Sequence, residues 1–258
     1  MGIADYEYTG LVAEAWDVLR GDTSGWQDRA FYLELIRSSG EPVLDVGCGT
    51  GRLLLDYAGL GIDIDGVDNS PEMLALCQQK ADARDIAVRV FLQEMVQLAL
   101  PRRYRTIVVP SSSLQLLTDP ADATRTLARL LEHLHPGGIL AASFMTLWVP
   151  GQALTSQWES SAQRIEDGAV FRRWARSRFD PDANCEHTED HYQKLVDGQV
   201  VAEEHHRRSP ATRSYTQEQA RALVEGAGFQ DVSVLHEFTF DAADPGDPLF
   251  VVMARRPR

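Results

Sequence analysis

The sequence predicts an α/β fold, in which a mainly parallel sheet has helices on both faces and is interrupted by an inserted antiparallel β segment. Two patterns support this prediction. Short apolar runs alternate with helical patterns over residues 41–145, as in a parallel sheet whose strands are joined by helices. Over residues 158–208 helical periodicity disappears and turn signals recur at strand-like intervals. With 258 residues, the chain is near the upper limit for one hydrophobic core.

The elements before the insert follow from hydrophobic periodicity. Two helices are expected near the N-terminus, over residues 11–19 and 31–36, because apolar residues recur there at helical spacing. Strands and helices then alternate. The expected strands are 42–46, 62–67, 87–92, 105–109 and 138–144, and the expected helices are 52–58, 71–83 and 121–135.

Turn residues divide the insert into four antiparallel strands. Asp167-Gly168 and Asp197-Gly198 are typical of hairpins, because this kind of turn needs positive φ. A third turn is expected at residues 180–184 (DPDAN), where turn-forming residues are concentrated. The insert is therefore predicted to be a β meander.

The α/β pattern returns after the insert. Thr216 and Gln219 form a capping box that begins a helix, and the glycines of residues 226–228 end it. Strands are expected over 229–235 and 249–254, where they would complete the first sheet. The prediction is one core, residues 1–150 and 214–258, with the meander of residues 151–213 inserted into it.

Charge and cysteine content exclude several classes of function. The net charge of −13 repels phosphate backbones and anionic lipid, so neither nucleic acid nor a membrane is expected as a partner. The three cysteines are far apart, which argues against a disulfide framework and suits a reducing cytoplasm. The N-terminus lacks the features of a signal peptide, and the longest apolar stretch, residues 138–149, is too short to span a bilayer. These features indicate a soluble cytoplasmic protein and leave its oligomeric state open.

The strongest motif is a glycine loop that follows the first predicted strand, at residues 43–51 (VLDVGCGTG). The strand contains Asp45 near its end, and glycines at every second position then allow a tight turn and a close approach of a ligand to the backbone. The dinucleotide fingerprint Gly-x-Gly-x-x-Gly competes for such a loop. Its third glycine is replaced here by Arg52, which disfavours a nicotinamide cofactor.

A carboxylate ends the next predicted strand. Asp68 is at the right distance along the chain for the second strand of a βαβ unit, where a carboxylate can accept hydrogen bonds from both hydroxyls of a ribose. Ser70 is expected to cap the following helix, with Pro71 in its first turn, and to leave Asp68 free. A calcium loop built on Asp63, Asp65 and Asp68 is rejected, because the required glycine and distal glutamate are misplaced.

These two motifs together resemble those of class I S-adenosylmethionine (SAM)-dependent methyltransferases, which have a Rossmann-like sheet. The match extends to the small-molecule branch with a β lid, which includes amino-sugar and glycine N-methyltransferases. It covers residues 1–147 well and 214–255 in pattern only. Residues 151–213 match in architecture alone, as a lid over the acceptor pocket.

The resemblance implies SAM as the cofactor and indicates which residues bind it. Glu94 stands where the family commonly has an aspartate that contacts the adenine amino group, and Met95 would pack on adenine. Tyr8 and, less directly, Trp16 and Trp26 would cover the methionine end, although core packing explains the tryptophans equally well. The implied cofactor-binding residues are Tyr8, Trp16, Asp45, Gly47, Cys48, Gly49, Gly51, Asp68, Asn69, Met73, Glu94, Met95, Pro110 and Ser111.

The segment over residues 108–117 (VVPSSSLQLL) resembles the serine-rich turn followed by His-Leu in methyltransferases that act on amino sugars. Gln115 stands at the histidine position and is the candidate catalytic residue, able to orient an acceptor but not to accept a proton readily. The segment also lacks the Asn/Asp-Pro-Pro-Tyr/Phe motif of amino-methylating DNA enzymes, which counts against a nucleobase substrate.

Charged side chains are concentrated in the insert. Cross-strand pairing with the acidic run of Glu186, Glu189 and Asp190 explains its arginines, and an arginine that points inward to an acidic substrate is the alternative. These arginines are Arg172, Arg173, Arg176 and Arg178.

The insert also holds four of the histidines. His187 and His191 share a strand face, and His205 and His206 are adjacent. A zinc site or a general base among them is conceivable, but no recognised ligand spacing is present, so no metal is predicted.

The predicted function is SAM-dependent transfer of a methyl group to a nitrogen or oxygen of a small metabolite. In such an in-line displacement the protein mainly aligns the reacting atoms, so the absence of a base does not argue against activity. A SAM-binding sensor or accessory protein without methyl transfer is the alternative, motivated by Gln115. A nicotinamide-dependent reductase is disfavoured by Arg52. The acceptor and its nucleophile are not determined by the sequence.

Overall fold

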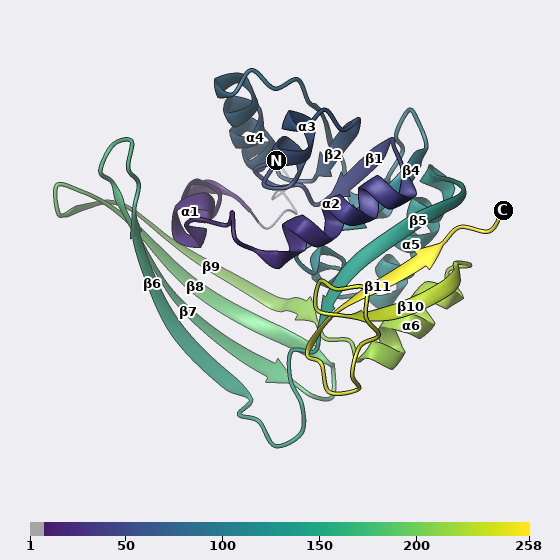
Figure 1. Ribbon diagram of the computed structural model, residues 1–258. Helices are drawn as coiled ribbons and strands as arrows, with labels where there is room; N and C mark the ends of the chain where they lie inside the picture. Colours follow the sequence, from purple (N-terminus) through teal and green to yellow (C-terminus); the bar gives the residue numbers. More distant parts are fainter. Residues whose placement is uncertain (1–7) are drawn as a thin grey trace.

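The computed structural model describes residues 8–258, which form two sheets and six α-helices (Figure 1). Residues 1–7 lie outside the described part. The expectation that the N-terminus is not a signal peptide rested on these residues, so the structure does not bear on it. The larger sheet has seven strands in the order β10-β11-β5-β4-β1-β2-β3. In chain order they are β1 Val43–Val46, β2 Ile64–Asp68, β3 Arg89–Leu92, β4 Tyr104–Val109, β5 Leu134–Met145, β10 Gln230–His236 and β11 Leu249–Arg255.

The direction of each strand follows from its connection. Neighbouring strands among β1 to β5 are parallel, because helices join them. β11 is antiparallel to both β5 and β10. The strands that follow the insert therefore complete the sheet that precedes it, and the predicted fold class is confirmed.

Helices cover both faces of the large sheet, as predicted. They are α1 Gly10–Arg20, α2 Gln27–Ser39, α3 Leu54–Gly59, α4 Pro71–Ala83, α5 Pro120–His133 and α6 Gln217–Gly226, with short 3-10 turns η1 Met95–Gln97 and η2 Ser113–Leu116. Alternate residues of a strand point to opposite faces. Accordingly Leu44 packs in the cluster that contains α5 and α6, whereas its neighbour Val43 packs in the cluster that contains α2, α3 and α4.

The second sheet consists of β6 Thr155–Gln163, β7 Val170–Asp180, β8 Cys185–Val196 and β9 Gln199–Arg213, and is called the lid below. It is an antiparallel meander with its turns at the predicted places, where Gly168, Asn184, Asp197 and Gly198 all have positive φ. Figure 1 shows the lid curving away from the large sheet, with α1 between them.

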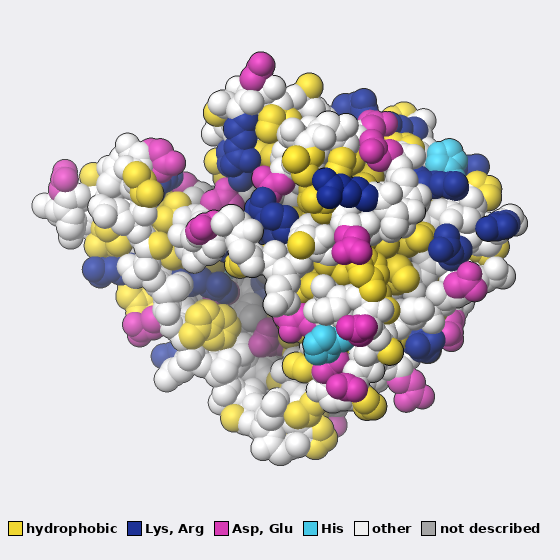
Figure 2. All heavy atoms as spheres, in the orientation of Figure 1, with side chains coloured by type: hydrophobic (Ala, Val, Ile, Leu, Met, Phe, Trp, Pro, Cys, Tyr) yellow, Lys and Arg dark blue, Asp and Glu magenta, His cyan; other side chains and the backbone are white. Residues whose placement is uncertain are grey.

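The contact between the lid and α1 includes an apolar cluster. Phe171 and Tyr192 of the lid pack with Leu11, Val12 and Ala15 of α1 in a small hydrophobic cluster. Figure 2 shows that the molecular surface is hollowed between the lid and the rest of the molecule. The lid is therefore held over the large sheet by α1 at one end and by the chain connections at the other.

Several predicted boundaries were wrong by two residues or more, including the strand starts expected at residues 62 and 87, which lie at Ile64 and Arg89. The strand expected to begin at residue 138 begins at Leu134, because Leu134 pairs with Tyr104 before a register shift in the β4–β5 ladder. The helix expected from residue 52 begins at Leu54, because the preceding residues still belong to the turn of the glycine loop. Within residues 8–258 no helix is long and apolar enough to cross a membrane.

Candidate functional site

A cavity of about 520 Å³ opens at the carboxyl ends of β1, β2 and β4, which is where ligands bind in open α/β sheets. Its volume is within the usual range for small-molecule sites, about 300–1,000 Å³. The glycine loop, the segments over residues 93–97 and 110–119, and Arg208 of the lid contribute to its walls. A single cavity thus contacts both the large sheet and the lid.

The structure brings together almost all of the predicted cofactor residues. Those that line the cavity are Tyr8, Trp16, Asp45, Gly47, Cys48, Gly49, Asp68, Asn69, Met73, Glu94, Met95, Pro110 and Ser111. Gly51 and the candidate catalytic residue Gln115 are not among the lining residues.

The glycines of the loop have different roles. All three have positive φ. A Cβ at Gly49 would meet no other atom within 4 Å, so this position leaves open space beside the backbone. A Cβ at Gly51 would lie 2.6 Å from Cys77 Sγ and 2.9 Å from Leu55 Cγ. Gly51 therefore permits the loop to pack against α3 and α4, while Gly49 keeps the cavity accessible.

Asp68 ends β2 and connects the glycine loop to α4. Its Oδ2 accepts a hydrogen bond from the Gly49 N–H and its Oδ1 accepts one from the Ser70 N–H, both at 2.9 Å. Ser70 caps α4 as predicted, since its hydroxyl accepts from the Met73 N–H. Asp68 is therefore not needed as the cap, as expected, but it also holds the Gly49 N–H of the glycine loop, which the sequence did not predict. Burial raises the pKa of Asp68, against the opposing effect of these backbone hydrogen bonds.

Asp45 is the second buried carboxylate in the cavity wall. Its side chain is 1% exposed, and its Oδ1 has no hydrogen-bond partner. Burial raises the pKa of Asp45 to about 7, an effect that the positive charge of Arg52 opposes and the negative charge of Asp68 reinforces. A buried acceptor without a partner, facing a cavity, is suited to a cationic or hydrogen-bond-donating group of a ligand.

Glu94 and Asn69 form the wall beyond β2 and β3. The Asn69 side-chain amide donates to Glu94 Oε1 at 3.2 Å and to Oε2 at 3.3 Å. Met73 is buried beneath them, and Met95 lies in η1. The Glu94 carboxylate is exposed and retains lone pairs, so it can accept a further hydrogen bond from a ligand amine.

The N-terminal segment covers another side of the cavity. The rings of Tyr8 and Trp16 are in edge-to-face contact, with centroids 4.7 Å apart. The Ser70 hydroxyl donates to the Tyr8 carbonyl oxygen at 2.6 Å. The Arg20 guanidinium lies over Trp16 and Trp26, 4.4 and 5.1 Å from the ring centroids. Trp26, which was also considered, does not line the cavity but supports Arg20, which does.

Arg52, which stands in place of the third glycine of a dinucleotide fingerprint, lines the cavity through a fixed side chain. It forms a bidentate ion pair with the buried Asp28, with Nη1 3.0 Å from Oδ1 and Nη2 2.5 Å from Oδ2. Its guanidinium also lies 4.9 Å from the Trp26 ring centroid. Arg52 thus anchors the loop to α2.

The predicted catalytic role of Gln115 is not supported by its position. The side chain is fully buried, and its amide nitrogen donates to the carbonyl oxygens of Met145 at 2.9 Å and Arg213 at 2.6 Å. Its Oε1 accepts from the Met145 N–H at 2.6 Å. These bonds use the hydrogen-bonding groups of the amide to join η2 to the ends of β5 and β9. Gln115 is therefore a structural link between the lid and the large sheet.

The histidines of the lid do not line the cavity. His187 bonds to the Ser209 hydroxyl, and His206, on the α1 side, lies 2.9 Å from Glu204. Within the part of the chain that the structure describes, the cavity wall contains no histidine. A general base of the kind considered for the histidines is thus absent from this wall.

Only some of the ion pairs predicted for the lid are present. Arg173 pairs with Asp190 at 2.7 Å, as expected, whereas Glu189 lies 3.4 Å from Arg207. The lid arginine that lines the cavity is Arg208 of β9, which was not among the arginines considered from the sequence. Strand alternation puts Arg208 on the same face as Ala202 and Glu204, but only the contacts of those two residues with α1 show that this face is turned inward.

Several other lining residues were also missed. Asp119, Asp122 and Arg125 lie at the start of α5, and Arg20 lies at the end of α1. Asp119 carries a recognisable signal as the N-cap before Pro120, and its side chain accepts from the Ala121 N–H. These residues give the cavity wall charged groups of both signs.

Comparison with known proteins identifies the kind of domain. Residues 43–138 match a family model described as a methyltransferase domain. The chain is 26% identical over 227 residues to the dTDP-3-amino-3,6-dideoxy-alpha-D-glucopyranose N,N-dimethyltransferase of Streptomyces fradiae, covering 86% of this chain and 85% of that protein.

Solved structures give the same result for the fold. A SAM-dependent methyltransferase from Clostridium acetobutylicum ATCC 824 is similar with a TM-score of 0.76 and 15% identity, covering 96% of this chain and 98% of that one. CalS10, an amino pentose methyltransferase from Micromonospora echinaspora solved with SAM, has a TM-score of 0.69 and 22% identity, covering 98% and 99%. The predicted resemblance is confirmed.

Proposed function

We propose that this chain, a class I SAM-dependent methyltransferase by its domain and its fold, transfers a methyl group to an amine nitrogen of a small acceptor molecule. The observation that carries this proposal is the pair of buried carboxylates, Asp45 and Asp68, at the ends of adjacent strands in one cavity wall. They flank a glycine loop whose Gly49 leaves room for a ligand.

The residues present fit SAM. The unpartnered Oδ1 of Asp45 suits the ammonium of its methionine part. The Asp68 carboxylate has about four acceptor sites and uses two for backbone N–H groups, which leaves capacity for the ribose hydroxyls. Glu94 and Met95 line the same cavity, which supports the proposal that they contact the adenine. Tyr8 and Trp16 cover the remaining side.

Bound SAM supplies an electrophilic methyl group on a sulfonium centre, so the chain has to align a nucleophile with it and exclude water. The lid and α1 enclose the space in which an acceptor would be held. A neutral amine is already a nucleophile, whereas a hydroxyl benefits from a base.

The relatives support the same choice. The Streptomyces fradiae protein is named as an N,N-dimethyltransferase of an amino sugar nucleotide, and CalS10 is described as an amino pentose methyltransferase. We extend this to a small amine as the acceptor here. In this proposal residues 1–150 and 214–258 bind SAM, and residues 151–213 cover the acceptor. Nucleic acid is not a proposed partner, because the net charge is −13.

The alternative of a SAM-binding sensor has lost its motivation. It rested on glutamine in place of histidine at position 115, but Gln115 is buried and bonded to backbone groups. Its identity therefore carries no information about methyl transfer.

The test combines binding with product analysis. Calorimetry is expected to show binding of SAM and of S-adenosylhomocysteine to the purified chain. Mass spectrometry of a panel of amino sugars, other small amines and phenols is then expected to show an added methyl group on amines only. No binding of either compound would remove the proposal. Methylation of phenols alone would overturn the choice of nitrogen.

A further inference from the structure

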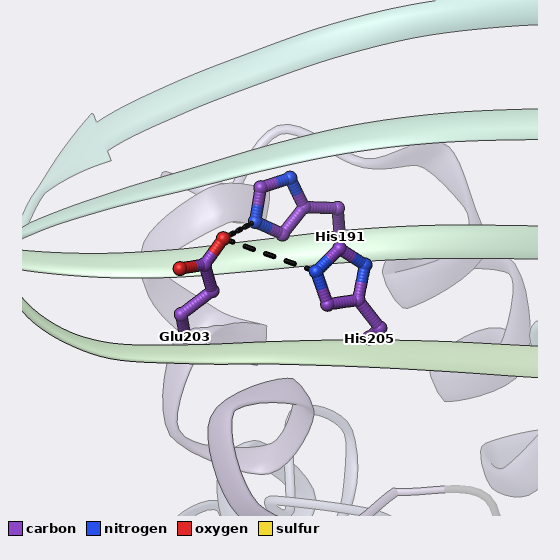
Figure 3. Close-up of side chains that lie close together, drawn as sticks. All are labelled: His191, Glu203 and His205. Carbon is purple, nitrogen blue, oxygen red and sulfur yellow. Dashed lines mark hydrogen bonds and ion pairs between the residues drawn. The ribbon is translucent and has the colours of Figure 1, made fainter.

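The lid carries a group of two histidines and one carboxylate that has no part in the cavity. His191 lies on β8, and Glu203 and His205 lie on β9 (Figure 3). His191 and His205 are directly opposite each other in the antiparallel ladder. Side chains two residues apart in a strand share a face, so Glu203 points to the same side as His205. Figure 3 shows the Glu203 carboxylate reaching toward a nitrogen of each ring.

This group is on the face of the lid that is turned away from α1. Tyr192 and Ala202, which are next to it along the strands, pack in the cluster with α1. Alternation therefore directs His191 and Glu203 to the opposite face. The side chains of His191, Glu203 and His205 are 27%, 45% and 73% exposed, so an ion from solvent can reach them.

The ligand atoms converge. Glu203 Oε1 lies 2.5 Å from His191 Nε2 and 3.8 Å from His205 Nε2. One ligand atom from each residue lies within 4.8 Å of the others. Ligand atoms bound to tetrahedral zinc at about 2.0–2.1 Å are roughly 3.3–3.4 Å from one another. Binding of one ion by both imidazoles also requires the His191 and His205 rings to tilt out of their nearly parallel stack, which their exposure leaves room for.

Neighbouring side chains orient the three residues. The Trp174 ring stacks on His191, with centroids 4.9 Å apart and an interplanar angle of 23°. The stack continues from His191 to His205, at 4.2 Å and 7°. Gln193 donates to Glu203 Oε1 at 3.4 Å. Groups that orient metal ligands in this way contribute to metal affinity.

We propose that His191, Glu203 and His205 bind a Zn²⁺ ion, with water completing its coordination. Two imidazoles and one carboxylate suit zinc and neighbouring transition metals, whereas Mg²⁺ and Ca²⁺ take oxygen ligands. The ion connects the middle of β8 to β9 and stabilises the lid. It is on the opposite face of the lid from α1 and takes no part in methyl transfer.

Zinc titration of the untagged full chain, treated first with a chelator, tests the proposal by calorimetry. One saturable site per chain is expected. Loss of a residue that hydrogen-bonds to a metal ligand typically weakens metal binding about 10–100-fold, so Gln193→Ala is expected to weaken Zn²⁺ binding within that range. His205→Gln removes a ligand and is expected to weaken Zn²⁺ binding about 100-fold or more. His187→Gln is the matched control, because His187 is on the same strand but bonds to Ser209 outside the group. Its Zn²⁺ affinity is expected to equal that of the wild type.

Thermal unfolding provides an independent measurement. Zn²⁺ is expected to raise the Tm of the wild type and of His187→Gln, but not of His205→Gln, because only a ligand that binds the folded state stabilises it. Absence of saturable binding, or equal affinity in the wild type and His205→Gln, overturns the proposal and leaves a cross-strand ion pair. Binding of S-adenosylhomocysteine, measured on the same samples, is expected to be unchanged, which keeps this test separate from that of the proposed function.

Discussion

Replacing Asp68 by alanine tests the core of the proposed site. In the folded chain its two carboxylate oxygens each hold one backbone N–H, at 2.9 Å, and the group is 9% exposed. The remaining acceptor capacity faces the cavity. Hydrogen bonds to a charged group contribute about 1.5–3 kcal/mol, so loss of the ribose contact is expected to weaken binding of S-adenosylhomocysteine roughly 10- to 150-fold.

The assay is calorimetry with two ligands, S-adenosylhomocysteine and an analogue that lacks both ribose hydroxyls. Asp68→Ala is expected to bind S-adenosylhomocysteine much more weakly than the wild type does, but to lose little affinity for the analogue without ribose hydroxyls. The difference between these two losses measures the contact between the carboxylate and the hydroxyls. Asp82→Ala, on the exposed side of α4, is the control. A folded Asp68→Ala variant with unchanged affinity would show that this cavity is not the cofactor site. Equal losses for both ligands would show that Asp68 acts only through the glycine loop.

Three further predictions follow from burial and packing. Burial raises the pKa of Asp45 to about 7, so the unfolded chain loses this proton at a lower pH than the folded chain, and stability falls as the pH rises from about 4 to 7. Between pH 5 and pH 8 the expected loss is about 3 kcal/mol. Asp45→Asn is expected to remove it when urea unfolding is compared at these two pH values, and the same pH dependence in the wild type and the variant would contradict it. Gly51→Ala combines positive φ with a clash against Cys77 and is expected to destabilise the fold by about 2–4 kcal/mol. The Cβ of Gly49→Ala meets open space, so this variant is expected to lose less stability but to bind S-adenosylhomocysteine more weakly. Equal urea midpoints for the two variants would refute the packing role of Gly51. Gln115→Ala leaves three backbone groups without their partner and is expected to lower stability by about 2–4 kcal/mol, while the variant still binds S-adenosylhomocysteine. A loss of that binding without a loss of stability would contradict a structural role for Gln115.

Local patterns were sufficient to predict most of the fold. α4 begins and ends where expected, at Pro71 and Ala83, because Ser70 supplies a side-chain cap immediately before it. The turns of the lid were predicted because Asp197 and Gly198 need positive φ whatever surrounds them. In both cases the deciding interaction is within a few residues.

The errors have the opposite cause. The partners of Gln115 are backbone groups 30 and 98 residues away in sequence, and no local pattern shows which of them it will meet. Ser70 caps α4 as expected, but the hydrogen bond from the Gly49 N–H to Asp68, 19 residues away in sequence, has no local signal. Arg208 enters the cavity wall only because the lid folds over the sheet. Motifs predict which residues gather at a strand end. Hydrogen bonds from backbone groups far away in sequence determine which of these side chains can still bind a ligand.

The first helix makes two sets of polar contacts, one in each direction. Toward the lid, the Leu11 N–H donates to Glu204 and the Glu14 carboxylate accepts from Arg164 and Lys194. Toward the glycine loop and α4, the Asp17 carboxylate accepts from Thr50 at 2.7 Å and from Lys80 at 2.8 Å.

Because one rigid helix makes both sets of contacts, a displacement of the β meander that admits an acceptor also alters the surroundings of Thr50. We therefore expect binding of the acceptor to change the affinity for SAM. By thermodynamic reciprocity, binding of SAM changes the affinity for the acceptor by the same factor. The coupling between the two reactants then depends on an element that contributes few atoms to either of them.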